Sequence, residues 1–252
     1  MERKTITGIS RATEGEANAT QGLTAELKST SIPDDELVNN ILLYSDRQRI
    51  GRFLFLLEMY KRIVNYHGVI MEFGCRWGQN LVVFSHLRSL LEPYNLSRKV
   101  VGFDTFAGFP SVNEKDGLSP LVVQGSFSTT PSFEERLERI LEAHQALSPI
   151  PNVRKFEIVK GDVEETLNAY LQRNPETVVA LAYFDMDIYK PTKTCLETII
   201  KRMLRAAVIG FDEVNYAPFP GETLAFDEVM GIRNHELHRS PYSTYTSYVI
   251  LD

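Results

Sequence analysis

The chain has 252 residues, of which 43% are hydrophobic, so it is long enough to bury the core of one large domain. Its net charge of −6 argues against a general nucleic-acid binder, because such proteins are usually basic. Two cysteines are too few for a disulfide framework or a cysteine-based zinc site, and no apolar run reaches the ~18–20 residues that cross a membrane. Residues 1–28 also lack the apolar core of a signal peptide, so we expect a soluble, cytoplasmic protein that binds neither nucleic acid nor a membrane.

The first part of the chain predicts an extension followed by alternating helices and strands. Residues 1–47 are expected to form either a lid over a site or a disordered tail, and one domain is expected over 48–252. Apolar residues at helical spacing predict a helix over 48–65. A strand over 68–73, a glycine-containing turn, a helix capped by Asn80 and a strand over 99–104 follow.

The rest of the chain repeats the strand–helix pattern after a long loop over 105–130, and loops of that length are often functional. Ser132 and Glu135 form a capping-box pattern at the start of the next helix. The remaining elements are predicted as a strand over 155–160, a helix over 163–173, a strand over 177–185, a helix over 192–204, a strand over 206–212, a helix over 222–230, and a hairpin of strands 236–238 and 246–251. Repeated strand–helix units predict an α/β fold whose parallel sheet is covered on both faces.

The first strand runs into a turn with two glycines, Glu72-Phe73-Gly74-Cys75-Arg76-Trp77-Gly78. The glycines let the backbone approach a ligand closely, and the helix that follows offers N–H groups to an anion. A dinucleotide site would show G-x-G-x-x-G here, so the G-x-x-x-G spacing disfavours NAD. Alone, the pattern also fits a tight turn that binds nothing.

Acidic residues at the next two strand ends extend this site. Asp104 ends the second strand, where an acid accepts hydrogen bonds from ribose hydroxyls, although it could also face solvent. Gly161 and Asp162 follow the third strand; Asp162 is a candidate contact for an adenine amino group, but Gly-Asp is also a common turn. Together, the glycine turn and Asp104 favour an adenosine ligand.

Four more acids follow two later strands: Asp185 and Asp187, then Asp212 and Glu213. Parallel strands present their carboxyl ends to one edge of the sheet, so these side chains are expected to converge. Clustered carboxylates repel one another, and oxygen ligands suit a hard cation such as Mg²⁺ or Ca²⁺. Pairing with Arg or Lys, or capping of the following helix, is the alternative.

The order of four motifs resembles the macrocin, mycinamicin and novobiocin sugar O-methyltransferase family of antibiotic biosynthesis. The motifs are the glycine turn, Gly102–Pro110, Lys160–Leu167 and Asp185–Thr192, and the resemblance runs over about residues 48–226. Residues 211–216 and 220–222 also resemble the calicheamicin-type sugar methyltransferases. The resemblance implies a class I methyltransferase fold, which is a Rossmann-like, doubly wound, seven-stranded sheet with a C-terminal antiparallel hairpin.

The resemblance also implies a reaction, in which S-adenosylmethionine and Mg²⁺ (or Ca²⁺) are used to methylate a sugar hydroxyl of a glycosylated natural product. Asp187 resembles the general base, and Asp185, Asp212 and Glu213 resemble metal ligands, with Glu213 standing where the family usually has Asp. The implied cofactor-binding residues are Glu72, Phe73, Gly74, Arg76, Trp77, Gly78, Asp104, Thr105, Phe106, Gly161, Asp162 and Asp185. The implied partners are a small-molecule glycoside and further copies of the chain.

Two other functions stay open on the residues alone. A hydroxylase-like enzyme on the same scaffold would need a metal, but an iron site normally has two His and one carboxylate, and the acidic cluster contains no His. A non-catalytic cofactor-binding protein would not require four acids at strand ends.

Overall fold

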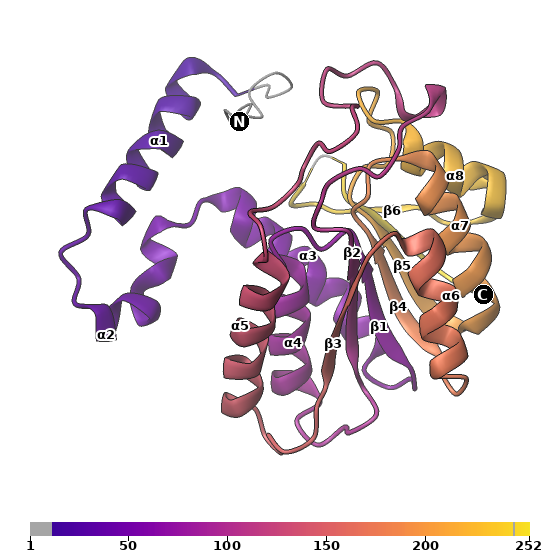
Figure 1. Ribbon diagram of the computed structural model, residues 1–252, viewed down its shortest axis with the longest axis horizontal. Helices are drawn as coiled ribbons and strands as arrows, with labels where there is room; N and C mark the ends of the chain where they lie inside the picture. Colours follow the sequence, from indigo (N-terminus) through magenta and orange to yellow (C-terminus); the bar gives the residue numbers. More distant parts are fainter. Residues whose placement is uncertain (1–11, 244) are drawn as a thin grey trace. The chain divides into compact units, whose positions relative to one another are not determined.

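The computed structural model of the protein describes residues 12–243 and 245–252. The chain forms two compact units, one that ends at Arg52 and one over Phe53–Asp252. The second unit holds a seven-stranded sheet in the order β3-β2-β1-β4-β5-β7-β6. Strands β1 to β5 are parallel, whereas β7 pairs antiparallel with β5 and β6 (Figure 1). This arrangement confirms the predicted fold, including its C-terminal hairpin.

The elements of the second unit alternate as the sequence predicts. The strands are β1 (Val69–Phe73), β2 (Val100–Asp104), β3 (Phe156–Lys160), β4 (Val179–Phe184), β5 (Met203–Phe211), β6 (His238–Arg239) and β7 (Ser247–Ile250). The helices are α3 (Arg47–Ile63), which begins in the first unit, α4 (Gln79–Leu91), α5 (Phe133–Leu147), α6 (Val163–Arg173), α7 (Tyr189–Ile199) and α8 (Gly221–Met230). Short 3-10 turns are η2 (Glu114–Asp116), η3 (Ile200–Arg202) and η4 (Ile232–Asn234). None of the helices in the described ranges is long and apolar enough to cross a membrane.

Two hydrophobic cores pack on the two faces of the sheet. Residues of α6, α7 and α8 form one core, and residues of α3, α4 and α5 form the other (Figure 1). Neighbouring strand residues point to opposite faces, so Tyr183 joins one core while Phe184 joins the other. Both faces of β4 are therefore buried, which explains its uninterrupted apolar sequence.

The described part of the first unit contains helices where the sequence suggested a lid or a disordered tail. It holds α1 (Glu14–Lys28), α2 (Asp34–Leu37) and the 3-10 helix η1 (Val38–Tyr44). Helix α1 begins at a capping box, in which Glu16 N donates to Thr13 Oγ1 at 3.2 Å and Thr13 N donates to Glu16 Oε2 at 2.8 Å. Residues 1–11 lie outside the described residues, and the lid role of 1–47 stays a prediction.

Three local predictions differ from the structure. Gly78, with φ 74°, is the N-cap of α4 in place of Asn80. Ser132 has φ 56° and makes no side-chain cap bond, so the Ser132–Glu135 capping box is absent. Helix α7 runs over Tyr189–Ile199 rather than 192–204: Pro191 is tolerated in its first turn, where a missing N–H breaks no helical hydrogen bond, and β5 already begins at Met203.

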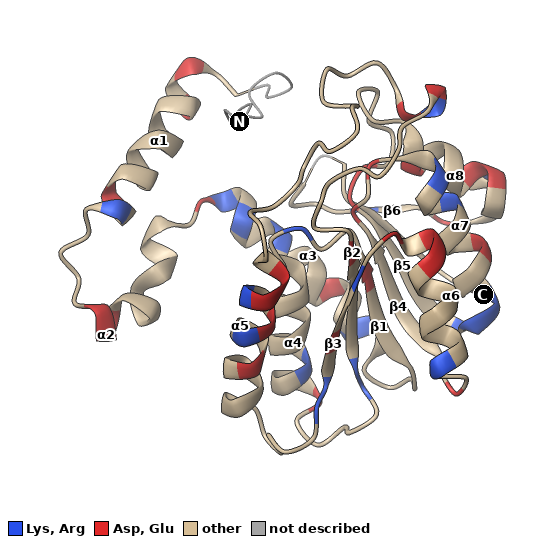
Figure 2. Cartoon of the chain, in the orientation of Figure 1, with Lys and Arg blue, Asp and Glu red and all other residues tan. Residues whose placement is uncertain are grey.

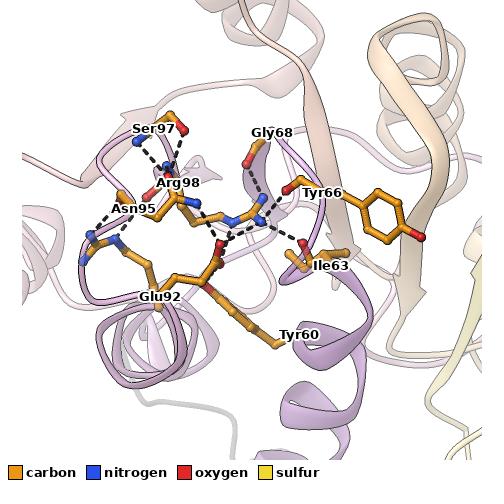
Figure 3. Close-up of polar contacts among 9 residues, drawn as sticks. Tyr60, Ile63, Tyr66, Gly68, Glu92, Asn95, Ser97 and Arg98 are labelled. Atoms are coloured by element: carbon orange, nitrogen blue, oxygen red, sulfur yellow. Dashed lines mark hydrogen bonds and ion pairs between the residues drawn. The ribbon is translucent and has the colours of Figure 1, made fainter.

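A buried ion pair joins the elements at the amino ends of the strands, where Lys and Arg gather at β2 and β3 (Figure 2). Arg98 is fully buried, and its Nε donates to Glu92 Oε2 at 2.8 Å. Its terminal nitrogens donate to the backbone carbonyls of Ile63, Tyr66 and Gly68 (Figure 3). One guanidinium therefore ties the end of α3 and the start of β1 to the end of α4.

The partner carboxylate Glu92 also accepts hydrogen bonds from Tyr60 Oη at 2.6 Å and from Asn95 Nδ2 at 2.7 Å. Burial raises the pKa of Glu92, but the hydrogen bonds from Arg98, Tyr60 and Asn95 outweigh it, and the net shift is downward. The stability that this shift contributes is present above the pKa of Glu in the unfolded chain. It is lost as the pH falls through the lower pKa of the folded state.

We expect the substitution Arg98→Met to lower the free energy of unfolding by about 3–5 kcal/mol, because it leaves a buried carboxylate without its counter-ion and three carbonyls without their donor. The matched control is Arg173→Met, because Arg173 pairs with Glu157 on the surface, where an ion pair contributes about 0–1 kcal/mol. Urea denaturation followed by circular dichroism measures both. Equal losses for the two variants would contradict this role of the buried pair.

Candidate active site

The glycine turn after β1 lies directly against the end of β4. Phe73 and Phe184 are paired in the sheet, and Asp185 N donates to Phe73 O at 2.8 Å. Gly74 has φ 90°, and a Cβ at this position would lie 1.9 Å from Asp185 O. Position 74 therefore has room only for glycine, and the ligand-binding turn predicted from the sequence touches the first acidic strand end.

Asp104, at the end of β2, organises this turn. Its Oδ2 accepts from Arg76 N at 2.7 Å and its Oδ1 accepts from Phe106 N at 2.5 Å. Burial raises the pKa of Asp104, while these backbone hydrogen bonds oppose the shift. Next to it, Thr105 Oγ1 donates to Gly108 O at 2.7 Å and fixes the start of the long loop. The structure thus brings Asp104 to the glycine turn; its contact with a ribose stays a prediction.

Asp162, the predicted adenine contact, caps a helix in the structure. Asp162 is the N-cap of α6, and its Oδ1 accepts from Glu164 N at 3.0 Å. Gly161 has φ 134°, and its N–H donates to Asp104 O at 2.9 Å. This is the Gly-Asp turn that the sequence left open as the alternative. A contact between Asp162 and a ligand stays a prediction.

Arg76 brings a positive charge to the acidic edge of the sheet. Its guanidinium carbon lies 5.1 Å from the ring centroid of Phe127 and 6.0 Å from that of Trp77. Burial lowers the pKa of Arg76, while the charges of Asp185 and Asp187 oppose the shift. Its Nε is buried and has no hydrogen-bond partner among the described residues. The side chain therefore has a donor available to an anionic ligand.

The acids after β4 and β5 lie close enough to shift one another's pKa values. Burial raises the pKa of Glu213 to about 12, and both the charge of Asp187 and a hydrogen bond with Asp187 add to the shift. The Glu213 and Asp187 side chains therefore share a hydrogen bond. Asp212 contributes to the same shift and accepts from Tyr183 Oη at 2.7 Å. Asp185 accepts from Asn80 Nδ2 at 3.4 Å.

Sequence reasoning assigned no role to Glu222, which the structure places inside this cluster. Glu222 is fully buried, and its pKa is raised by burial and by the charges of Asp187, Asp185 and Asp212. A Cβ on the preceding Gly221 would lie 2.6 Å from Asp187 O, so α8 begins in contact with the Asp187 backbone. In the sequence, Glu222 stood in the 220–222 segment that resembles the calicheamicin-type methyltransferases, at the start of a predicted helix, but nothing there indicated a role for its side chain.

The structure does not support the predicted Mg²⁺ or Ca²⁺ site. Over residues 12–243 and 245–252, no group of three or more Asp, Glu, His or Cys side chains is placed to hold a metal ion. Glu213, a predicted ligand, instead shares a hydrogen bond with Asp187. As placed, these residues do not fit a metal, and the ligand roles of Asp185, Asp212 and Glu213 stay predictions.

Comparison with solved structures identifies the class of protein. CalS11, a calicheamicin methyltransferase, matches with a TM-score of 0.94 and 37% identity over 99% of this chain and 98% of that chain. An apo structure of CalS11, a TDP-rhamnose 3′-O-methyltransferase in calicheamicin biosynthesis, matches with a TM-score of 0.84 and 35% identity over 96% of each chain. The O-methyltransferase NovP, with a TM-score of 0.60 and 17% identity over 80% of each chain, supports the fold alone. No protein-family model and no curated protein sequence matches.

Fold and site therefore define a class I O-methyltransferase. At this level of identity over nearly the full length, the chain belongs to the sugar O-methyltransferase family that contains CalS11, as the sequence motifs indicated. Membership in this family favours methyl transfer over the hydroxylase-like and non-catalytic alternatives.

We expect Gly74→Ala to be more harmful than Gly125→Ala. Both glycines have positive φ, 90° and 81°, so either substitution costs about 1–2 kcal/mol of backbone strain. Only at position 74 does the new Cβ also collide with backbone, whereas nothing lies within 4 Å at position 125. The collision adds about 1–3 kcal/mol. Thermal unfolding measures the difference, and equal shifts in Tm would refute the contact between Gly74 and Asp185.

Proposed function

We propose that the protein transfers the methyl group of S-adenosylmethionine to a sugar hydroxyl of a glycosylated natural product. The contact between Gly74 and Asp185 carries this proposal, since it places a turn suited to the methyl donor beside the strand end that bears Asp187. Family membership supports the reaction type, and the relative CalS11 acts in calicheamicin biosynthesis.

Residues around the glycine turn suit the parts of this methyl donor. The N–H groups of Gly74 and Gly78 donate to Phe103 O and Cys75 O, so the first turn of α4 is left to offer N–H groups to its carboxylate, and Arg76 offers a charged donor. Asp104 suits the ribose hydroxyls, and the half-exposed Trp77 offers an aromatic face to the adenine. When bound, S-adenosylmethionine supplies a positively charged sulfonium with an electrophilic methyl group.

Asp187 is the proposed general base. It removes the proton of the sugar hydroxyl, and the hydroxyl oxygen then attacks the methyl carbon as the bond from that carbon to sulfur breaks. The hydrogen bond that Asp187 shares with Glu213 restricts the orientation of its side chain. Most of the rate enhancement is expected to come from positioning the reactants.

Aromatic rings on three loops offer flat surfaces on which a sugar or another flat-faced acceptor could stack. Phe109 and Phe127, on the long loop, have ring centroids 5.2 Å apart, and Phe127 lies 6.1 Å from Phe219. Tyr216 lies 6.2 Å from Phe219 and 4.3 Å from Tyr245. Because CalS11 is a TDP-rhamnose methyltransferase, a sugar still attached to a nucleoside diphosphate is a second candidate acceptor.

We expect Asp187→Asn to abolish methyl transfer and to leave cofactor affinity nearly unchanged, because it removes a base and keeps the shape of the side chain. Titration calorimetry with S-adenosylhomocysteine measures the affinity, and assays with nucleotide-linked and product-linked sugars measure transfer. Full turnover by the variant would defeat the assignment of the base. Failure of the wild-type protein to bind S-adenosylhomocysteine would defeat the proposed function.

The same assay tests the metal dependence that the family resemblance implies. Wild-type turnover is measured after treatment with EDTA and again after addition of Mg²⁺. A loss that Mg²⁺ restores supports metal dependence, whereas unchanged turnover in EDTA rejects it. No step of the mechanism above passes through a metal.

We also propose that the protein associates with further copies of itself through its N-terminal helices. Helices α1, α2 and η1 contain no buried residue, and Val38, Leu42 and Leu43 are 78%, 68% and 64% exposed. Apolar side chains gathered in this way are typical of surfaces that a partner covers. Light scattering is expected to give a mass above that of one chain, and the double substitution Leu42→Asp with Leu43→Asp is expected to lower it. A monomeric wild-type protein would contradict self-association.

A further inference from the structure

The backbone around Asp187 adopts a conformation that needs external support. Asp187 has φ 63°, in the left-handed region that residues with a Cβ adopt at a cost. The residues on either side of it link β4 to α7. Of their N–H groups, Asp185 N donates to Phe73 O in β1 and Ile188 N donates to Met186 O within the segment. A base must be held within a fraction of an ångström to act, so whatever fixes this backbone affects the reaction.

Two fully buried carboxylates bind the N–H groups of this segment. Glu222 Oε1 accepts from Met186 N at 3.0 Å and from Asp187 N at 3.3 Å. Asp116 Oδ1 accepts from Tyr189 N at 2.7 Å. Both acids are 0% exposed, and they come from different elements, α8 and η2.

The second oxygen of each acid binds another loop. Glu222 Oε2 accepts from Glu213 N at 3.2 Å, which follows β5, and Asp116 Oδ2 accepts from Asn113 N at 2.7 Å, in the long loop. Each carboxylate therefore links the Asp187 segment to a separate part of the site. A carboxyl group suits this task because each of its two oxygens can accept a hydrogen bond.

We propose that Glu222 and Asp116 are positioning residues that hold the base Asp187 in its reactive orientation through the backbone of residues 186–189. This inference rests on the proposed function. Neither residue is a member of the set assigned to the cofactor or the base. Their effect is on the geometry of Asp187, so they should govern turnover rather than cofactor affinity.

The amide variants Glu222→Gln and Asp116→Asn test this inference. An amide has one acceptor oxygen and one NH₂ donor, so at least one backbone N–H then faces a donor while the shape of the side chain is kept. Glu228→Gln is the matched control, because Glu228 is also on α8 and accepts from the Tyr189 hydroxyl rather than from its backbone. Glu228 is exposed and pairs with Lys115 and Lys193.

We expect kcat to fall about 100-fold in Glu222→Gln, since a displacement near 1 Å can cost that much. KM for the acceptor and Kd for S-adenosylhomocysteine should stay within about twofold, and Glu228→Gln should match the wild type.

Wild-type kcat in both amide variants, or a loss of kcat accompanied by an equal loss of cofactor affinity, would overturn the proposal. If Glu222→Gln fails to fold, the same split between kcat and Kd is read from Asp116→Asn. If the wild-type protein binds cofactor but transfers no methyl group to any sugar, the proposed function fails and this inference fails with it. If the wild-type protein is active, the variants test the positioning role alone.

Discussion

The contact between the glycine turn after β1 and the end of β4 is the constraint on which the site depends. Parallel pairing of these two strands brings Gly74 against Asp185 O, and no side chain fits between them. The turn that suits the methyl donor and the strand end that carries the acids are therefore parts of one backbone assembly. The chemistry of the family needs this proximity, and the sheet supplies it before any ligand binds.

Buried charge is handled differently at the two edges of the sheet. At the amino edge, Arg98 and Glu92 pair directly, and backbone carbonyls, Tyr60 and Asn95 fill their remaining hydrogen-bonding capacity, so this edge contributes to stability. At the carboxyl edge, burial and the charges of neighbouring acids raise the pKa of Glu213 and of Glu222. Unfavourable clustering of like charges is common at functional sites, where perturbed protonation is useful.

Much of the fold follows from the sequence, because apolar runs and helical periodicity report burial directly. The α6 bounds and the parallel pairing of the first five strands were predictable in this way, whereas the place of the terminal hairpin in the sheet came from the family resemblance. The capping box of α1 was overlooked, and the left-handed Ser132 could not be inferred, because tertiary packing decides which cap forms. The site residues at strand ends were visible as motifs. Glu222 was not, since its role comes from three backbone N–H groups that are distant in sequence.

The aromatic residues near the site lie on loops, whereas the glycine turn and the acids lie at the ends of paired strands. Loops tolerate substitution and insertion far better than the backbone of a buried sheet does. Selection for a new acceptor can therefore act on the rings of the long loop and of the β5–α8 connection while the reacting centre stays intact. The architecture therefore keeps the rings that can vary with the acceptor apart from the residues that form the reacting centre.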